Sequence, residues 1–191
     1  MAPDVALNVL WVVWAVSWFA AALWSSRAAK RPGFGAELLY RIVTIIGAVL
    51  LFGTHHSDQE AIPLWRIGDS AAWVFVGVAA LGFVFCWWAR IHLGRLWSGF
   101  VTRKADHRIV DSGPYGIVRH PIYTGIILSV FATAAFKGTA VAFLGAVVMT
   151  LGFWIKARLE ERFLSQELGA DAYDSYRRRV PMLVPFGPKA A

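Results

Sequence analysis

The sequence predicts an all-α integral membrane protein with about five transmembrane helices. Of its 191 residues, 58% are hydrophobic and the mean hydropathy is positive, whereas soluble domains of this length are usually less than half apolar. Long apolar runs recur along the chain, and a helix of about 20 apolar residues crosses a hydrocarbon core of about 30 Å. The formal net charge is +7, and most of the cations lie on one side of these runs.

Three spans are expected in the first part of the chain, residues 1–92. The run Val5–Trp24 carries no charge. A signal peptide is the alternative interpretation, but no basic residue precedes this run and basic residues follow it. The second span extends from about Leu38 to Gly53. The third, Ala71–Ala89, ends in Trp87-Trp88, a pair typical of the membrane interface.

Residues 93–191 are expected to form a second unit, which holds the remaining two spans. The stretch Arg90–Arg119 is too polar to cross a membrane. The next run, Ile122–Ile155, is nearly all apolar but too long for one span, and Phe136-Lys137-Gly138-Thr139 interrupts it. This pattern predicts two helices joined as a hairpin. From Lys156 onward the chain is polar, which indicates a partly helical segment outside the bilayer.

The distribution of positive charge predicts the orientation. Of nineteen Lys and Arg residues, only Arg66 and Lys137 fall on the side of the polar turns at 54–69 and 137. The positive-inside rule therefore puts the N-terminus outside and the C-terminus in the cytoplasm. A basic net charge that arises from membrane orientation gives no reason to expect a nucleic-acid partner. The expected partners are the lipid bilayer and a lipophilic substrate.

Several classes of catalytic site are disfavoured. The single cysteine, Cys86, lies in an apolar run and excludes a disulfide framework. No Walker loop, nucleophile elbow or spaced Cys/His cluster is present, and His55-His56 with Asp58 and Glu60 is a weak metal candidate because adjacent histidines point in different directions. An enzyme of this sequence is expected to need neither a metal nor a covalent nucleophile.

The stretch Gly113–Gly125 concentrates turn, cationic and aromatic residues just before the hairpin. Pro121 suits the first turn of a helix, where its missing N–H has no intrahelical acceptor. Arg119 and His120 are therefore expected at a helix N-terminus, which offers free N–H donors and positive potential. For the Arg-His pair alone, a juxtamembrane basic anchor is the simpler interpretation.

Four motifs in the second part of the chain together resemble one enzyme family. They are Gly-Pro-Tyr at 113–115, Arg-His-Pro-x-Tyr-x-Gly at 119–125, Glu160-Glu161, and Tyr173-x-x-Tyr176. The pattern looks like the isoprenylcysteine carboxyl methyltransferases and their bacterial relatives, and the resemblance covers about residues 93–186. These are integral membrane enzymes that use S-adenosylmethionine, so the resemblance implies methyl transfer to a lipophilic carboxylate, amine or thiol. A sulfonium methyl is already activated, so the protein need only align donor and acceptor and exclude water.

The resemblance also implies a set of site residues. The expected catalytic cations are Arg119, Lys156 and Arg158. The family holds the substrate carboxylate with an arginine about one turn before its glutamate, and in this chain the matching position is nearer Lys156, with Arg158 close by. One glutamate is expected to accept hydrogen bonds from the ribose hydroxyls. The implied cofactor contacts are Thr102, His107, Arg108, Ile109, Val110, Tyr115, His120, Pro121, Ile122, Tyr123, Gly125, Glu160 and Glu161.

Some alternatives remain open at this point. Sterol reductases share a similar helical core, and such a membrane reductase would need an NADPH site. A non-catalytic membrane scaffold with a basic cytosolic face is the other alternative. The resemblance further implies that the tail folds over the cofactor site with Tyr173 and Tyr176 packed inward. The triplet Arg177-Arg178-Arg179 is expected to contact anionic lipids, and Glu160-Glu161 taken alone is typical of a solvated helix start.

Overall fold

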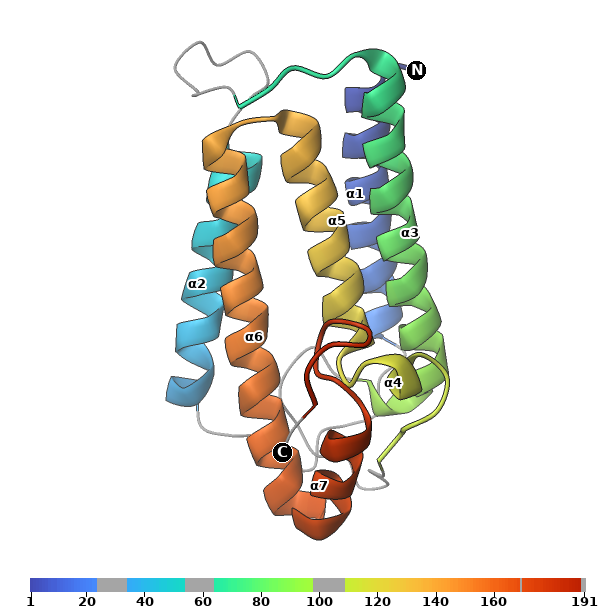
Figure 1. The fold of residues 1–191 in the computed structure, drawn as a ribbon, viewed down its shortest axis with the longest axis vertical. Coiled ribbons are helices and arrows are strands. Elements are labelled where there is room, and N and C mark those ends of the chain that lie inside the picture. The colour runs from blue at the N-terminus through green and yellow to red at the C-terminus, as the bar shows by residue number, and fades with distance from the viewer. Residues whose placement is uncertain (24–33, 54–63, 98–108, 169, 190–191) are drawn as a thin grey trace.

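The computed structural model of the chain describes residues 1–23, 34–53, 64–97, 109–168 and 170–189. The regular elements in these ranges are all helical, and the long helices stand side by side in one bundle (Figure 1). Two short helices, α4 and α7, lie at one end of this bundle. In chain order the elements are α1 (Pro3–Ala22), α2 (Phe34–Phe52), α3 (Asp69–Leu93), the 3₁₀ turn η1 (Gly94–Leu96), α4 (Pro114–Ile117), α5 (Pro121–Lys137), α6 (Ala140–Leu168) and α7 (Ala170–Arg179).

The apolar helices confirm a multi-pass, all-α membrane protein. Among the described residues, α1, α3 and α6 are long and apolar enough to cross a membrane, and α5 is a shorter apolar helix. The predicted hairpin is confirmed, because α5 ends at Lys137 and Gly138 caps it with a left-handed φ of 64°. The segment after Ile155 is helical in large part, as expected: α6 continues without a break past Ile155, so Glu160 and Glu161 lie inside this helix.

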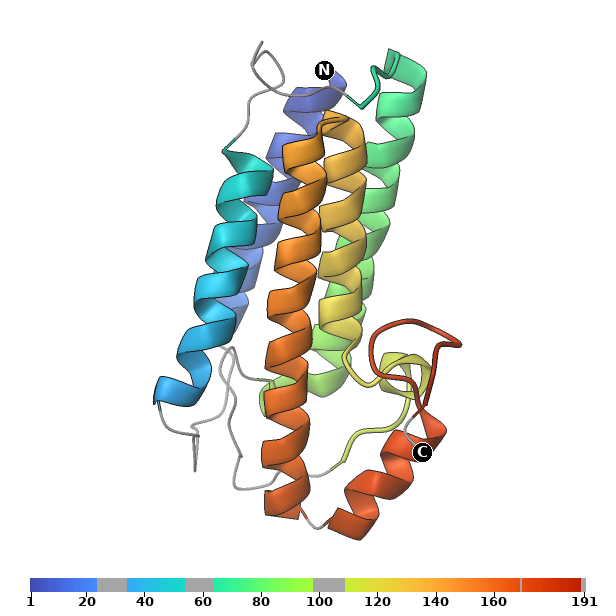
Figure 2. The same ribbon diagram turned by 60° about the vertical axis from the view of Figure 1, so that its left-hand side comes forward.

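The packing order brings distant parts of the sequence together at one end. Helix α2 packs along α6, α3 along α5, and α1 on α3, while α5 and α6 are neighbours. Two views of the bundle show the hairpin turn at the end opposite to α4 and α7 (Figure 1, Figure 2). The N-terminus lies with the hairpin turn, and the start of α5 lies with α7 (Figure 1). The motif at residues 113–125 and the pair Glu160-Glu161 therefore share one end of the bundle, as the charge pattern predicted.

Three tryptophans of α1, Trp11, Trp14 and Trp18, form a stripe along this helix that is a packing surface. Trp14 stacks on Phe83 of α3, with ring centroids 4.9 Å apart, and Trp18 meets Trp97 edge to face at 5.4 Å. The indole of Trp11 donates a hydrogen bond of 2.9 Å to a threonine hydroxyl of α5. These contacts bury large aromatic area against α3 and α5, so the stripe attaches α1 to the rest of the bundle.

Arg90 departs from the expected arrangement. The polar stretch was expected to begin at this residue, but Arg90 lies in the last turn of α3 and is completely buried. Its guanidinium donates to the carbonyl oxygens of Ala21 at 2.8 Å and Gly94 at 2.7 Å. The cation also lies 4.4 Å from the ring centroid of Trp97. A buried cation with these partners ties the end of α1 to the end of α3.

Gly125 lies at a close contact between α5 and α3. A Cβ at this position would stand 2.4 Å from the carbonyl oxygen of Gly82 and 2.6 Å from the sulfur of Cys86. Small residues at such crossings let helix backbones approach each other in a membrane. This packing accounts for a glycine at position 125.

The close contact predicts a packing effect for Gly125→Val. The added methyl groups have no space, and overpacking of this kind costs about 1–3 kcal/mol. We expect a lower midpoint of thermal unfolding in detergent. Gly77→Val on α3 is the matched control, because nothing lies within 4 Å of the Cβ position of Gly77. Equal midpoints for the two variants would contradict this description of the α3–α5 contact.

Candidate functional site

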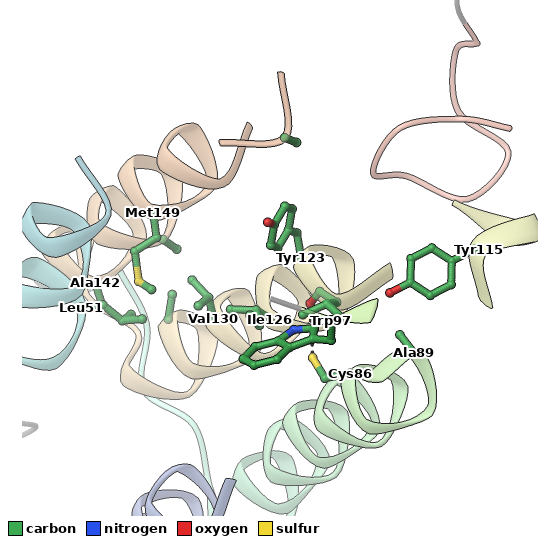
Figure 3. Packing of buried hydrophobic residues seen from close by; sticks show 14 residues of the cluster. Leu51, Cys86, Ala89, Trp97, Tyr115, Tyr123, Ile126, Val130, Ala142 and Met149 are labelled. Carbon is green, nitrogen blue, oxygen red and sulfur yellow. Dashed lines mark hydrogen bonds between the residues drawn. The ribbon is translucent and has the colours of Figure 1, made fainter. Parts of the chain in front are cut away.

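A tight turn fixes α4 against the end of α3. Gly113 has a φ of 56°, and a Cβ there would lie 2.7 Å from the ring of His92. Both constraints favour glycine at this position. Tyr115 in α4 is buried and lies nearly parallel to the His92 ring, with centroids 6.3 Å apart. Tyr115 and Tyr123 lie at the edge of the main buried cluster, which also contains Trp97 (Figure 3).

The start of α5 is covered by the C-terminal tail. His120 is the N-cap residue and Pro121 the first residue of α5, as the sequence predicted. The N–H of Arg119 donates to the carbonyl oxygen of Pro181 at 2.8 Å, and that of His120 donates to Met182 at 3.1 Å. We call residues 180–183 the C-terminal strap. This strap satisfies backbone donors that a helix start leaves free.

A buried ion pair holds the C-terminal strap and α6 against Arg119, just before α5. The Nε of Arg119 donates to Oε1 of Glu161 at 2.6 Å, and both side chains are about 5% exposed. The same guanidinium donates to the backbone carbonyls of Arg177 and Val180. Arg177 approaches the other oxygen of Glu161 at 3.5 Å. Arg119, expected to act on the substrate, thus binds a buried carboxylate and the tail.

His120 bridges the two glutamates. Its Nε2 lies 3.1 Å from Oε1 of Glu161 and its Nδ1 lies 3.5 Å from Oε2 of Glu160. Burial by itself lowers the pKa of His120, but hydrogen bonds to Glu160 and Glu161 outweigh it, so the pKa is raised. The imidazole therefore favours its charged form, in which both nitrogens donate. Its ring stacks on Tyr123, with centroids 5.4 Å apart.

Glu160 is the more accessible carboxylate. Its side chain is 18% exposed, against 4% for Glu161. One oxygen of Glu160 accepts a 2.7 Å hydrogen bond from the hydroxyl of Tyr123. Since both glutamates lie in the interior of α6 with protein partners, the interpretation of the pair as a solvated helix start is wrong. Glu161 is enclosed by the ion pair, whereas Glu160 keeps partial access from outside.

Lys156 stands beside Glu160 on the same face of α6. Its ammonium lies 5.2 Å from the ring centroid of Tyr123 and 5.5 Å from that of Tyr40. The carboxylates of Glu160 and Glu37 interact electrostatically with this ammonium. Aromatic rings on two sides suit a cation that is partly removed from water. Helix α2 thereby contributes to the site.

The remaining expected residues fall into three groups. Arg158 is on an exposed face of α6, with its guanidinium 5.6 Å from the ring centroid of Trp154, so it points away from the cluster around Glu160. A second group is buried around the start of α5 and the tail. Pro121 and Ile122 are buried in α5. Ile109 packs against Tyr173 and Tyr176, and Val110 packs against the main buried cluster. Thr102, His107 and Arg108 lie outside the described residues, as do His55 and His56.

The tail tyrosines pack inward, as expected. Tyr173 and Tyr176 are both 4% exposed. The hydroxyl of Tyr176 donates to the carbonyl oxygen of Tyr115 at 2.7 Å. Within the basic triplet, Arg177 faces Glu161 and Arg179 forms an ion pair of 3.0 Å with Asp111 before α4. These two arginines therefore stabilise the tail within the protein. Arg178 is exposed, and a contact of the triplet with anionic lipids stays a prediction.

Tyr40 and Arg177 were not identified from the sequence. A signal for the α2 contribution was present, because Glu37, Tyr40 and Arg41 recur at helical spacing within an otherwise apolar run. Ionisable residues within a membrane span commonly mark a functional site. For Arg177 no local signal distinguishes an ion pair to another helix from a contact with lipid headgroups.

Comparison with known proteins adds a family relationship. Residues 75–166 match the isoprenylcysteine carboxyl methyltransferase (ICMT) family. The chain is 38% identical to methanethiol S-methyltransferase 2 of Bradyrhizobium diazoefficiens over 64% of this chain and 50% of that protein. It is 33% identical to protein-S-isoprenylcysteine O-methyltransferase of Schizosaccharomyces pombe, over 52% of this chain and 43% of that protein. The cobalt-zinc-cadmium resistance protein CzcN of Cupriavidus metallidurans is 30% identical over 75% of this chain and 60% of its own length. The chain therefore spans about half the length of these curated relatives.

Proposed function

Since this chain belongs to the isoprenylcysteine carboxyl methyltransferase family, we propose that it is a membrane methyltransferase. It transfers the methyl group of S-adenosylmethionine to a lipophilic acceptor that reaches the site from the bilayer. Residues 93–191 form the methyltransferase core, and residues 1–92 supply three of five spans. The end of the bundle that carries the motif faces the cytoplasm, by the positive-inside rule.

The chemistry of the residues around Glu160 supports this cofactor. S-adenosylmethionine needs an acceptor for its ribose hydroxyls, a cation for its carboxylate and apolar or aromatic walls. The partly exposed carboxylate of Glu160 suits the hydroxyls, and Tyr123 and His120 supply aromatic surface and positive charge beside it. When bound, the cofactor supplies an activated methyl group. Thr102, His107 and Arg108 remain predicted contacts.

We infer different roles for the two glutamates, and the hydrogen bonds around them support this inference. Glu160 binds the ribose, and its orientation is set by the Tyr123 hydroxyl and the His120 imidazole. Glu161 positions Arg119 and the C-terminal strap. The strap in turn limits the access of water to the start of α5. Excluding water strengthens the electrostatic contacts of a site and protects the transferred group. The partial exposure of Glu160 beside a fully enclosed Glu161 is the observation that carries this assignment.

An anionic acceptor suits the ammonium of Lys156. Two relatives are named for methanethiol and for isoprenylcysteine, which present a thiol and a carboxylate. A thiolate or carboxylate would be attracted to Lys156, and the rings of Tyr40 and Tyr123 offer an apolar surface to the rest of the molecule. An amine acceptor fits this arrangement less well, because the positive charge that it gains as it takes up the methyl group would lie beside a like charge.

This role predicts a selective defect in Lys156→Met. Losing a charged partner costs about 1.5–3 kcal/mol, so kcat/KM for an anionic acceptor should fall about ten- to a hundredfold. The dissociation constant for S-adenosylmethionine should change little. Arg158→Met is the control, because Arg158 stacks on Trp154 at the exposed face. Equal losses in both variants, or a loss confined to donor affinity, would refute the role of Lys156.

The activity itself is tested in proteoliposomes with methyl-labelled S-adenosylmethionine. Methanethiol, a prenylated cysteine and a phospholipid amine are supplied separately as acceptors. Label should pass to the thiol or the carboxylate and not to the amine. A reductase would instead consume NADPH with a sterol or isoprenoid substrate, and neither the described residues nor the named relatives favour that activity.

A further inference from the structure

The strap continues into a turn with an unusual conformation. The N–H of Gly187 donates to the carbonyl oxygen of Val184 at 2.9 Å, which closes the turn. Phe186 within it has a φ of 61°, a region that bulky residues rarely occupy and that usually holds glycine. Its side chain is 99% exposed, and that of Val184 is 65% exposed. The chain thus keeps a bulky apolar side chain at a strained and fully exposed position, which indicates a contact outside the protein.

The turn lies beside the start of a membrane helix. The hydroxyl of Thr124, in the first turn of α5, donates to the carbonyl oxygen of Leu183 at 2.6 Å. Both ribbon views place the tail loop at the outside of the bundle, next to α4 and the start of α5 (Figure 1, Figure 2). The last turns of α3, at the same end, expose Trp88 and Ile91. Aromatic residues at this level of a membrane protein lie among lipid headgroups.

We propose that Val184, Pro185 and Phe186 form a membrane wedge that inserts into the interfacial layer of the bilayer. The wedge extends the apolar surface of the neighbouring helices, and the exposed cations Arg178 and Lys189 flank it in sequence. Cations beside an apolar insertion favour anionic lipid headgroups. Because the wedge directly follows the C-terminal strap, its insertion holds the strap against Arg119 and His120. This inference is independent of the methyl-transfer reaction.

Spin labelling tests the position of the wedge. Phe186→Cys is labelled, reconstituted into vesicles with anionic lipid, and compared with Lys189→Cys by its accessibility to oxygen and to a water-soluble nickel complex. The native Cys86 is completely buried, so labelling of the wild type measures the background. Position 186 should favour oxygen and position 189 nickel. Equal nickel accessibility at both positions, or a label at 186 that neither reagent reaches because a second copy covers it, would overturn the proposal.

A second experiment uses variants that preserve the turn. Phe186→Gly relieves the positive φ and leaves the fold intact, but it removes the apolar side chain. Trypsin cleavage of the reconstituted protein in the region of Arg177–Arg179 should become severalfold faster in Phe186→Gly and in Phe186→Asp. Phe186→Leu, which retains an apolar group, should keep the wild-type rate. Wild-type rates in all three variants would show that the bilayer does not hold the strap.

Discussion

Glu161→Gln is expected to destabilise the protein by about 3–5 kcal/mol, because removing one partner of a buried ion pair leaves the other charge uncompensated. Arg119 would keep its two backbone acceptors but lose its only described carboxylate. The unfolding midpoint in detergent reports the loss of stability. The rate at which protease cleaves the tail reports whether the C-terminal strap has been released. Asp111→Asn is the control, since Asp111 pairs with Arg179 at an exposed position, and such pairs contribute about 1 kcal/mol or less.

The double variant Arg119→Met/Glu161→Gln gives a stricter test. Replacing both charges removes the uncompensated cation, so part of the lost stability should return relative to Glu161→Gln alone. If Glu161→Gln were as mild as Asp111→Asn, the pair would not fix the strap. If the double variant were less stable by the sum of both single effects, the two side chains would act independently.

Glu160→Gln is expected to weaken binding of S-adenosylmethionine about ten- to a hundredfold, the equivalent of about 1.5–3 kcal/mol for a charged hydrogen-bonding group. The glutamine oxygen can still accept from Tyr123, and Glu161 still pairs with His120, so the stability of the fold should fall less than in Glu161→Gln. The ribose contact is the same in the ground and transition states. The apparent KM for the donor should therefore rise more than kcat falls.

Glu161→Gln separates this effect from general damage to the site. Donor affinity is measured at a temperature where the variant is still folded. Glu160→Gln should then be the weaker binder of the two. Loss of affinity only in Glu161→Gln would reverse the roles of the two carboxylates, and normal affinity in both would remove them from the cofactor site.

Local signals accounted for much of the fold. The interruption at residues 136–139 predicted the hairpin, because a glycine directly after a cation is a common helix end and the run is too long for one span. Pro121 likewise marked the first residue of α5. Charge counting placed the motif and Glu160-Glu161 at one end of the bundle, since it depends only on the order of spans and turns.

The errors concern polar residues whose partners lie far away in the sequence. The polar composition after Ile155 did not reveal that Glu160 and Glu161 lie within one continuous helix, where they meet Tyr123 of α5 and Arg177 of α7. Arg90 looked like the start of a polar loop, although backbone carbonyls and Trp97 hold it in the interior. Composition does not distinguish a charge in solvent from one in a buried pair.

Sequence motifs also did not indicate that α2 contributes a residue to the candidate site. Tyr40 belongs to the part of the chain without a family pattern, and its ring reaches Lys156 only because α2 packs along α6. Such a contact depends on the rotation of two helices about their axes. The same reasoning applies to Arg177, whose partner became clear only from the position of α7 beside α6.

A calorimetric titration of the purified wild-type protein tests the central assignment most directly. S-adenosylmethionine and NADPH are titrated separately, with Glu160→Gln as the matched variant. We expect saturable binding of S-adenosylmethionine at one site per chain, weakened in Glu160→Gln, and no saturable binding of NADPH. Saturable binding of NADPH without binding of S-adenosylmethionine would contradict the assignment of this site to a methyl donor.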